Sequence, residues 1–206
     1  IVSGVIFVQD VPPAARTAYL KGVGDFEKNQ EQGLAEIEEA LRIFPNYFEA
    51  LNWVGKELIS ARQYEKGYPY LLRAIDINSR SPETYYSLGF AFYQMKKYPA
   101  ALEAVKATTT LAPASIDAHL LYGTILRITG NYAEAETALL KANSFAKKTN
   151  AEVHWQLSLL YNRLKRNEDT ITELETFLKL VPDSPDKNRI KDMIAKLKDS
   201  ANNTKQ

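Results

Sequence analysis

Two histidines are the side chains of this sequence best suited to act as a general base or a metal ligand near neutral pH. In the repeating pattern of the chain, His119 and His154 take places that Leu51 and Tyr85 fill elsewhere. The chain has no cysteine, which removes disulfides, thiolate nucleophiles and cysteine-bound metals. No nucleophile–base pair accompanies either histidine. The sequence therefore predicts histidines that pack inward, no enzymatic activity, and no cofactor or metal.

A Gly-x-Gly sequence at Gly22 and Gly24 is the pattern closest to a phosphate-binding loop. Such a loop follows a strand directly and continues into a lysine–serine pair, and the sequence has neither feature here. The two glycines stand inside a predicted first helix, where each costs about 1 kcal/mol relative to alanine. A nucleotide site is not expected.

The elements that carry these residues repeat with a period of 34. Residues of one type recur at that spacing, at Gly55, Gly89 and Gly123 and at Tyr64, Tyr98 and Tyr132. Prolines close three of the periods, at Pro45, Pro113 and Pro182. A fixed period of this length is typical of stacked helical repeats, in which each repeat covers the apolar face of its neighbour. The predicted repeats are residues 14–47, 48–81, 82–115, 116–150 and 151–184.

The third repeat is the most regular. Its large apolar, small and closing residues are Tyr85, Leu88, Gly89, Phe92, Ala101, Val105 and Pro113. This pattern resembles the tetratricopeptide repeat family. The first repeat departs from it, because Lys21 stands at the glycine place and Gly24 at the aromatic place. The resemblance implies an all-α, right-handed superhelical solenoid of five helix hairpins.

The two ends of the chain lie outside the repeats. Residues 1–11 are rich in Val, Ile and Phe and end at Pro12, which predicts a β-strand within a segment spanning residues 1–13. It is interpreted either as the last strand of a missing upstream domain or as a tail along the first helix, and an open strand edge could support self-association. Residues 185–199 are predicted to form a capping helix, and residues 200–206 a disordered tail.

Charge and hydropathy limit the classes of partner that the sequence predicts. Lysine and arginine number 26 against 25 aspartates and glutamates, for a net charge of +1. Phosphate binding usually needs a basic excess, so no nucleic-acid partner is predicted. No apolar run approaches the ~20 residues that cross a bilayer, and no signal peptide is visible. The compartment is left open between cytoplasm and periplasm, with export favoured if an upstream signal was removed.

The resemblance also implies a ligand surface, because four positions of each leading helix face a concave groove in this family. Tyr, Trp and Arg are the residue types that dominate interface energies. The predicted peptide-binding groove comprises Asn52, Lys56, Tyr86, Phe90, Tyr93, Gln94, Leu120, Thr124, Arg127, Trp155, Leu159, Asn162 and Arg163.

The sequence thus predicts a non-catalytic scaffold that binds a protein or peptide as an extended segment or helix, within a larger bacterial protein. Two alternatives stay open. The chain could space or self-associate the domains of a larger protein, or it could be the regulatory arm of an enzyme whose catalytic domain lies upstream.

Overall fold

The computed structural model describes residues 7–203, and within this range the chain forms eleven α-helices and no strand. The predicted all-α helical-repeat class is confirmed. The helices are α1 (Pro13–Phe26), α2 (Gln30–Ile43), α3 (Phe48–Ser60), α4 (Tyr64–Ile77), α5 (Pro82–Gln94), α6 (Tyr98–Leu111), α7 (Ile116–Ile128), α8 (Tyr132–Phe145), α9 (Ala151–Arg163), α10 (Asn167–Leu180) and α11 (Lys187–Asn203). No helix in this range is both long and apolar enough to cross a bilayer.

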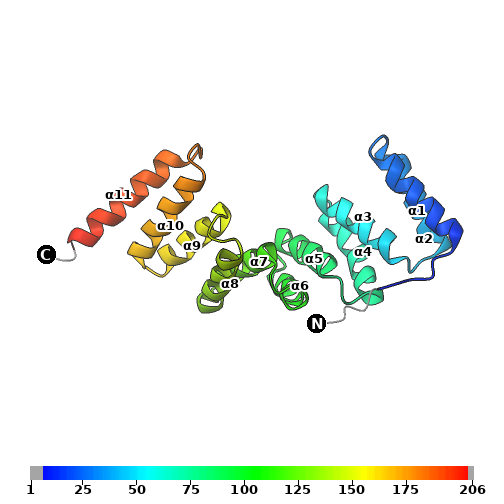
Figure 1. Cartoon of the computed structure of the whole chain (residues 1–206), viewed down its shortest axis with the longest axis horizontal. Coiled ribbons are helices and arrows are strands. Elements are labelled where there is room, and N and C mark those ends of the chain that lie inside the picture. The colour runs from blue at the N-terminus through cyan, green and yellow to red at the C-terminus, as the bar shows by residue number, and fades with distance from the viewer. Residues whose placement is uncertain (1–6, 204–206) are drawn as a thin grey trace. The chain divides into compact units, whose positions relative to one another are not determined.

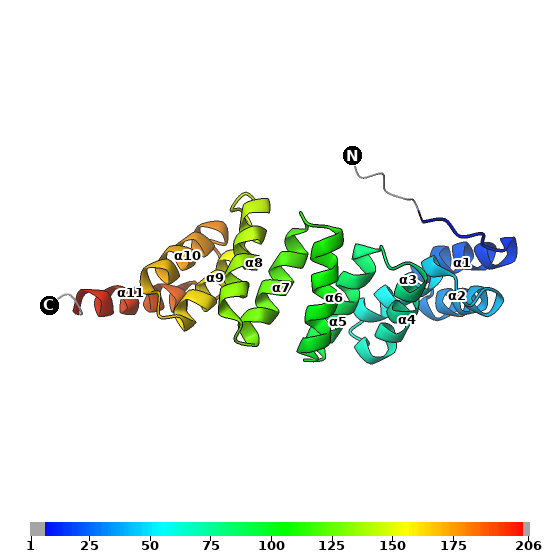
Figure 2. The same cartoon turned by 90° about the horizontal axis from the view of Figure 1, so that it is seen from below.

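The helices divide between two compact bodies that meet in sequence between Leu111 and Ala112. The N-terminal body holds α1–α6 and the C-terminal body holds α7–α11. Within each body, consecutive helices form hairpins: Figures 1 and 2 show α3 beside α4 and α5 beside α6.

Three leading helices, α5, α7 and α9, begin after a residue whose side chain caps the helix. Ser81 precedes the predicted helix start at Pro82, and its hydroxyl accepts a hydrogen bond from the Thr84 backbone N–H at 3.4 Å. Ser115 does the same for Ala118 at 3.2 Å. Such caps satisfy backbone donors that have no partner inside the helix, so they fix the first turn of α5 and α7.

A left-handed residue follows the end of four leading helices. These residues have positive φ angles: Arg62 at 60°, Lys96 at 57°, Gly130 at 87° and Lys165 at 60°. Glycine adopts this conformation without strain, whereas a basic residue does so at some conformational cost. A cation beside a helix C-terminus is in turn favoured by the helix dipole. The turns after α3, α5 and α9 therefore carry a positive charge next to the helix end.

In the first hairpin, the residue at the close contact between α1 and α2 is Gly22, whereas the 34-residue period predicted Lys21. A Cβ at Gly22 would lie 2.5 Å from the Ile37 side chain and 2.7 Å from the Gly33 carbonyl oxygen. Lys21 is exposed, and its ammonium pairs with Glu36. The assignment of Lys21 to the glycine place is thus wrong by one residue, because α1 meets α2 in a register one residue shorter than the later hairpins.

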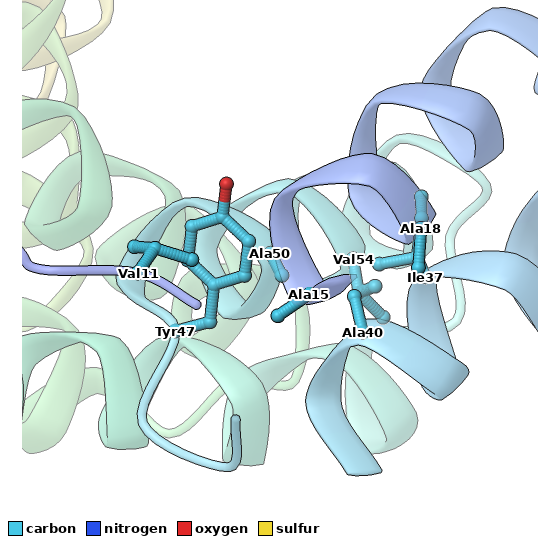
Figure 3. Close-up of a cluster of buried hydrophobic side chains, with 8 residues drawn as sticks. All are labelled: Val11, Ala15, Ala18, Ile37, Ala40, Tyr47, Ala50 and Val54. Carbon is cyan, nitrogen blue, oxygen red and sulfur yellow. The ribbon is translucent and has the colours of Figure 1, made fainter. Parts of the chain in front are cut away.

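The N-terminal segment contributes to the core of the N-terminal body without forming a strand. Figure 3 shows Val11, only 7% exposed, beside the ring of Tyr47, together with alanines of α1, α2 and α3. Small side chains at these positions let three helices approach closely. Val11 is therefore a core residue.

Residues 7–12 are irregular chain, so the predicted strand does not form there; residues 1–6 lie outside the described range. The segment is held by hydrogen bonds of the Gln9 side chain and not by the backbone hydrogen bonds of a β-sheet. Its amide donates to the Asn46 carbonyl at 2.7 Å, and its oxygen accepts from the Phe48 N–H at 2.8 Å. The Phe7 and Phe48 rings also meet edge to face at 5.2 Å. Residues 7–12 thus dock onto the start of α3, whereas the tail interpretation placed them along the first helix.

We expect Tyr19 to make the stability of the N-terminal body sensitive to alkaline pH. Burial, followed by the charges of Tyr47 and Glu49, raises the pKa of Tyr19 from 10.0 to about 12. A raised pKa means that the unfolded chain loses this proton first, so the free energy of unfolding should fall as pH rises through this interval. Urea titrations at several pH values should show a shallower fall for Tyr19→Phe, and an equal slope would contradict the assignment.

The C-terminal body ends on α11, which lays Ile190 and Ile194 against Leu174 of α10. The helix continues to Asn203, beyond the predicted end at residue 199. No proline or glycine interrupts residues 199–203, and the Ser200 hydroxyl donates to the Lys196 carbonyl at 2.9 Å. The predicted disordered tail is thus helical over residues 200–203, and residues 204–206 lie outside the described range.

Candidate functional site

The predicted groove residues all lie on leading helices and divide between the two bodies. The N-terminal body carries Asn52 and Lys56 on α3, and Tyr86, Phe90, Tyr93 and Gln94 on α5. The C-terminal body carries Leu120, Thr124 and Arg127 on α7, and Trp155, Leu159, Asn162 and Arg163 on α9.

Three of these side chains meet at a pocket of about 280 Å³ in the N-terminal body, which we call the α3–α5 pocket. Its lining residues are Lys56, Ile59, Ser60, Arg62, Tyr64, Tyr86, Ser87 and Phe90. The pocket lies where the last turns of α3, the start of α4 and the middle of α5 come together. Hairpin packing therefore gathers residues that are far apart in the sequence.

Aromatic rings and cations define the chemistry of the α3–α5 pocket. The Tyr64 and Phe90 rings lie 6.4 Å apart at an interplanar angle of 74°, an edge-to-face contact. Lys56 and Arg62 are exposed, and none of the described lining residues is a carboxylate. Such a surface combines apolar contact with attraction for negative charge.

Asn52 has a structural role that the sequence did not suggest. Its side-chain oxygen accepts a hydrogen bond from the hydroxyl of Thr84, which is fully buried, at 2.9 Å. This bond joins α3 to α5, the leading helices of two consecutive repeats. Asn52 also lines a neighbouring pocket of about 260 Å³, together with Lys56, Trp53 and Glu49. Lys56 therefore lies between two pockets.

Tyr93 and Gln94 do not join the residues that line the α3–α5 pocket. The Tyr93 ring lies 6.4 Å from the ring of Tyr98, the first residue of α6, and Gln94 is exposed. The last turn of α5 carries both residues past the pocket.

In the C-terminal body, Arg127 is engaged with a neighbouring helix. Its guanidinium donates two hydrogen bonds to the side-chain oxygen of Gln156, at 2.9 and 3.2 Å. Gln156 in turn donates to Glu152 at 2.7 Å. Thr124 is only 7% exposed, so its hydroxyl lies in the interior rather than on a ligand surface.

The remaining predicted residues of α9 lie at the edges of the interior. Trp155 packs against the cluster formed by α10 and α11, with its ring 5.4 Å from Phe177. Leu159 and Asn162 are half-buried, and exposed Arg163 donates to the Tyr132 hydroxyl at 3.1 Å. The predicted groove residues of α9 thus contact neighbouring helices and remain partly or fully exposed to solvent.

The pocket also contains residues that sequence reasoning missed, chiefly Arg62 and Tyr64. The family positions used for the prediction end before the turn between the two helices of a hairpin. A usable signal existed, because Tyr64 belongs to the 34-residue recurrence, and Arg62 precedes it by two positions.

Both histidines pack inward, as predicted. His119 is 6% exposed, bonds the Pro113 carbonyl oxygen at 2.9 Å and stacks on Phe145. His154 is 4% exposed and contacts Glu173 and the Lys148 carbonyl oxygen. Among residues 7–203, no cluster of three or more His, Cys, Asp or Glu could hold a metal ion.

Comparison with known proteins supports the resemblance to the tetratricopeptide repeat family. A family model described as "Tetratricopeptide repeat" matches residues 86–151. In Dictyostelium discoideum, the general transcriptional corepressor trfA is 31% identical over 137 residues, which is 64% of this chain and 10% of the relative. In Methanocaldococcus jannaschii, the TPR repeat-containing protein MJ1428 is 27% identical over 129 residues, which is 62% of this chain and 22% of the relative. The match thus spans a minor part of each curated relative.

Solved structures share the fold. The MamA protein superposes with a TM-score of 0.76 at 20% identity, covering 81% of this chain and 91% of MamA. YrrB, described as a TPR protein with an unusual peptide-binding site, superposes with a TM-score of 0.73 at 18% identity, covering 84% of this chain and 88% of YrrB. The family model, the relatives and the solved structures together support a tetratricopeptide repeat protein.

Proposed function

We propose that the chain is a non-catalytic protein-interaction module, and that its N-terminal body binds a segment of a partner protein at the α3–α5 pocket. The observation that supports this proposal is the joining of Lys56, Tyr86 and Phe90 in one pocket with Tyr64 and Arg62. Aromatic side chains and arginine supply most of the binding energy at protein interfaces. The peptide-binding description of YrrB, a protein with the same fold, supports the same class of function.

The geometry favours an extended peptide that lies across α3 and α5. A half-buried aromatic surface can take an apolar side chain of the ligand, while exposed Lys56 and Arg62 can pair with a carboxylate beside it. The Asn52–Thr84 bond holds the two helices in register. The pocket is therefore preorganised, which lowers the entropic cost of binding.

Peptide selection with the intact chain tests this proposal. A random peptide library displayed on phage would be panned against the chain, with counter-selection on Lys56→Ala/Tyr86→Ala. We expect selected peptides to bind the double variant at least tenfold more weakly by calorimetry, since truncated interface anchors often cost about 2 kcal/mol.

A matched control removes a cation and an apolar side chain elsewhere in the same body. Lys106 and Leu72 are exposed and do not line the pocket, so Lys106→Ala/Leu72→Ala should bind as the original chain does. Equal affinity for both double variants would place the binding surface elsewhere, and the proposal would fail.

A further inference from the structure

A second pocket, of about 230 Å³, lies in the C-terminal body and differs in charge from the first. Its lining residues are Glu152, Trp155, Phe177, Ser184, Asp186 and Ile190. They come from α9, α10, the turn after α10 and α11, and we call this site the α9–α11 pocket. It exists because α11 folds back onto α10 and brings the turn at residues 184–186 beside the start of α9.

Two aromatic rings form its wall. The Trp155 and Phe177 rings have centroids 5.4 Å apart at an interplanar angle of 46°. Both rings are half-buried and pack against the cluster of Leu174, Ile190 and Ile194. Their positions are therefore fixed by the core. The face of an aromatic ring attracts a cation, and tryptophan does so most strongly.

Two exposed carboxylates flank these rings, Glu152 in the first turn of α9 and Asp186 in the turn before α11. Ser184 holds that turn by accepting a hydrogen bond from the Asp186 N–H at 3.3 Å. Among the described residues that line this pocket, none is a lysine, arginine or histidine. The α3–α5 pocket has the reverse arrangement, two cations and no lining carboxylate.

The groups that contact the two carboxylates leave them able to bind a further cation. Gln156, which donates to Glu152, is neutral. Arg189 approaches Asp186 at 3.9 Å, but its side chain is 88% exposed. A long, exposed ion pair of this kind contributes little. Arg127 is held by Gln156 and is not part of the lining.

We propose that the α9–α11 pocket binds a lysine or arginine side chain of a partner protein. The cation would lie over the Trp155 and Phe177 rings, and its charge would be balanced by Glu152 and Asp186. Burial of the aliphatic stem against the rings adds apolar contact. This site is independent of the α3–α5 pocket, so either can fail while the other holds.

The experiment uses four blocked tripeptides that differ in their central residue: Ac-Gly-X-Gly-NH₂ with arginine, lysine, norleucine or glutamate. Each is titrated into the full chain at constant ionic strength while the indole N–H signals of both tryptophans are followed by NMR. The chain has two tryptophans, and the signal of Trp53, which lines a pocket of the N-terminal body, reports separately on any binding there. We expect the Trp155 signal to shift saturably with the arginine and lysine peptides only.

Variants that remove a negative charge but keep the size of the side chain test whether the two carboxylates contribute to binding. Glu152→Gln and Asp186→Asn should each weaken binding of the arginine peptide about threefold, and together about tenfold, as expected for exposed charges. Glu168→Gln is the control, because Glu168 is an exposed acid in the first turn of α10 just as Glu152 is in α9. It should change nothing. Norleucine binding as tightly as arginine, a response to the glutamate peptide, or no Trp155 shift at millimolar peptide would each overturn the proposal.

Discussion

Replacing Gly22 by alanine is expected to lower the free energy of unfolding by about 2–3 kcal/mol, the range seen when atoms are forced into a packed core. The added Cβ would lie 2.7 Å from the Gly33 carbonyl oxygen and 3.0 Å from the Ile37 backbone nitrogen. Backbone atoms cannot rotate away as a side chain can. The hairpin of α1 and α2 would have to open to admit the methyl group.

The same substitution two residues away should have the opposite sign. A Cβ at Gly24 would meet nothing within 4 Å, and the residue lies inside α1. Alanine there should raise the free energy of unfolding by about 0.5–1 kcal/mol, because the unfolded chain loses backbone freedom.

Urea denaturation followed by far-UV circular dichroism would compare the two variants with the original chain. Because both positions lie in one helix, helix propensity is matched and only the surroundings differ. Equal effects at Gly22 and Gly24 would show that the close approach of α1 and α2 contributes little to stability.

The fold class could be predicted because the recurring residues have a direct steric meaning. Ser81 and Pro82 mark the start of α5, and Gly89 marks a close approach of α5 and α6, so local chemistry and packing agree. Register in the first hairpin could not be predicted in this way. The repeat pattern in the sequence does not decide whether Lys21 or Gly22 takes the glycine place. The packing decides it, because Gly22 is the residue that faces α2.

The candidate site was harder to predict, since facing a groove is not the same as being accessible. Thr124 lies on the predicted groove face yet is buried. The side-chain oxygen of Asn52 accepts a hydrogen bond from Thr84. Trp155 is packed beside a helix that follows the last repeat. Arg62 joins the α3–α5 pocket through the turn that ends α3. These contacts depend on how neighbouring helices pack. The position of a residue within its own repeat does not determine that packing.

A further large effect is expected at the contact between α9 and α10. The Nδ1 atom of His154 lies 2.5 Å from a Glu173 carboxylate oxygen, and its Nε2 atom lies 3.2 Å from the Lys148 carbonyl oxygen. The two side chains are 5% and 14% exposed. A buried polar group that loses its partner costs about 1–3 kcal/mol, so Glu173→Ala should lower the free energy of unfolding by that amount.

The neighbouring Glu175 provides a control on the same helix. Its carboxylate accepts a hydrogen bond from the Lys198 ammonium at 2.8 Å, but the two side chains are 44% and 54% exposed. Exposed ion pairs contribute about 1 kcal/mol or less. Glu175→Ala should therefore change the free energy of unfolding less than Glu173→Ala does, and equal losses would argue against any special role of burial at Glu173.

A double-mutant cycle would isolate the contact itself. Leucine is suitable at position 154, because Leu51 fills the corresponding place in the second predicted repeat and is fully buried. In a chain carrying His154→Leu, the further change Glu173→Ala leaves no histidine nitrogen without its carboxylate. We expect that second change to cost less than it does in the original chain, with a coupling free energy of about 1–2 kcal/mol. Strict additivity would show that the histidine and the carboxylate contribute separately, through packing alone.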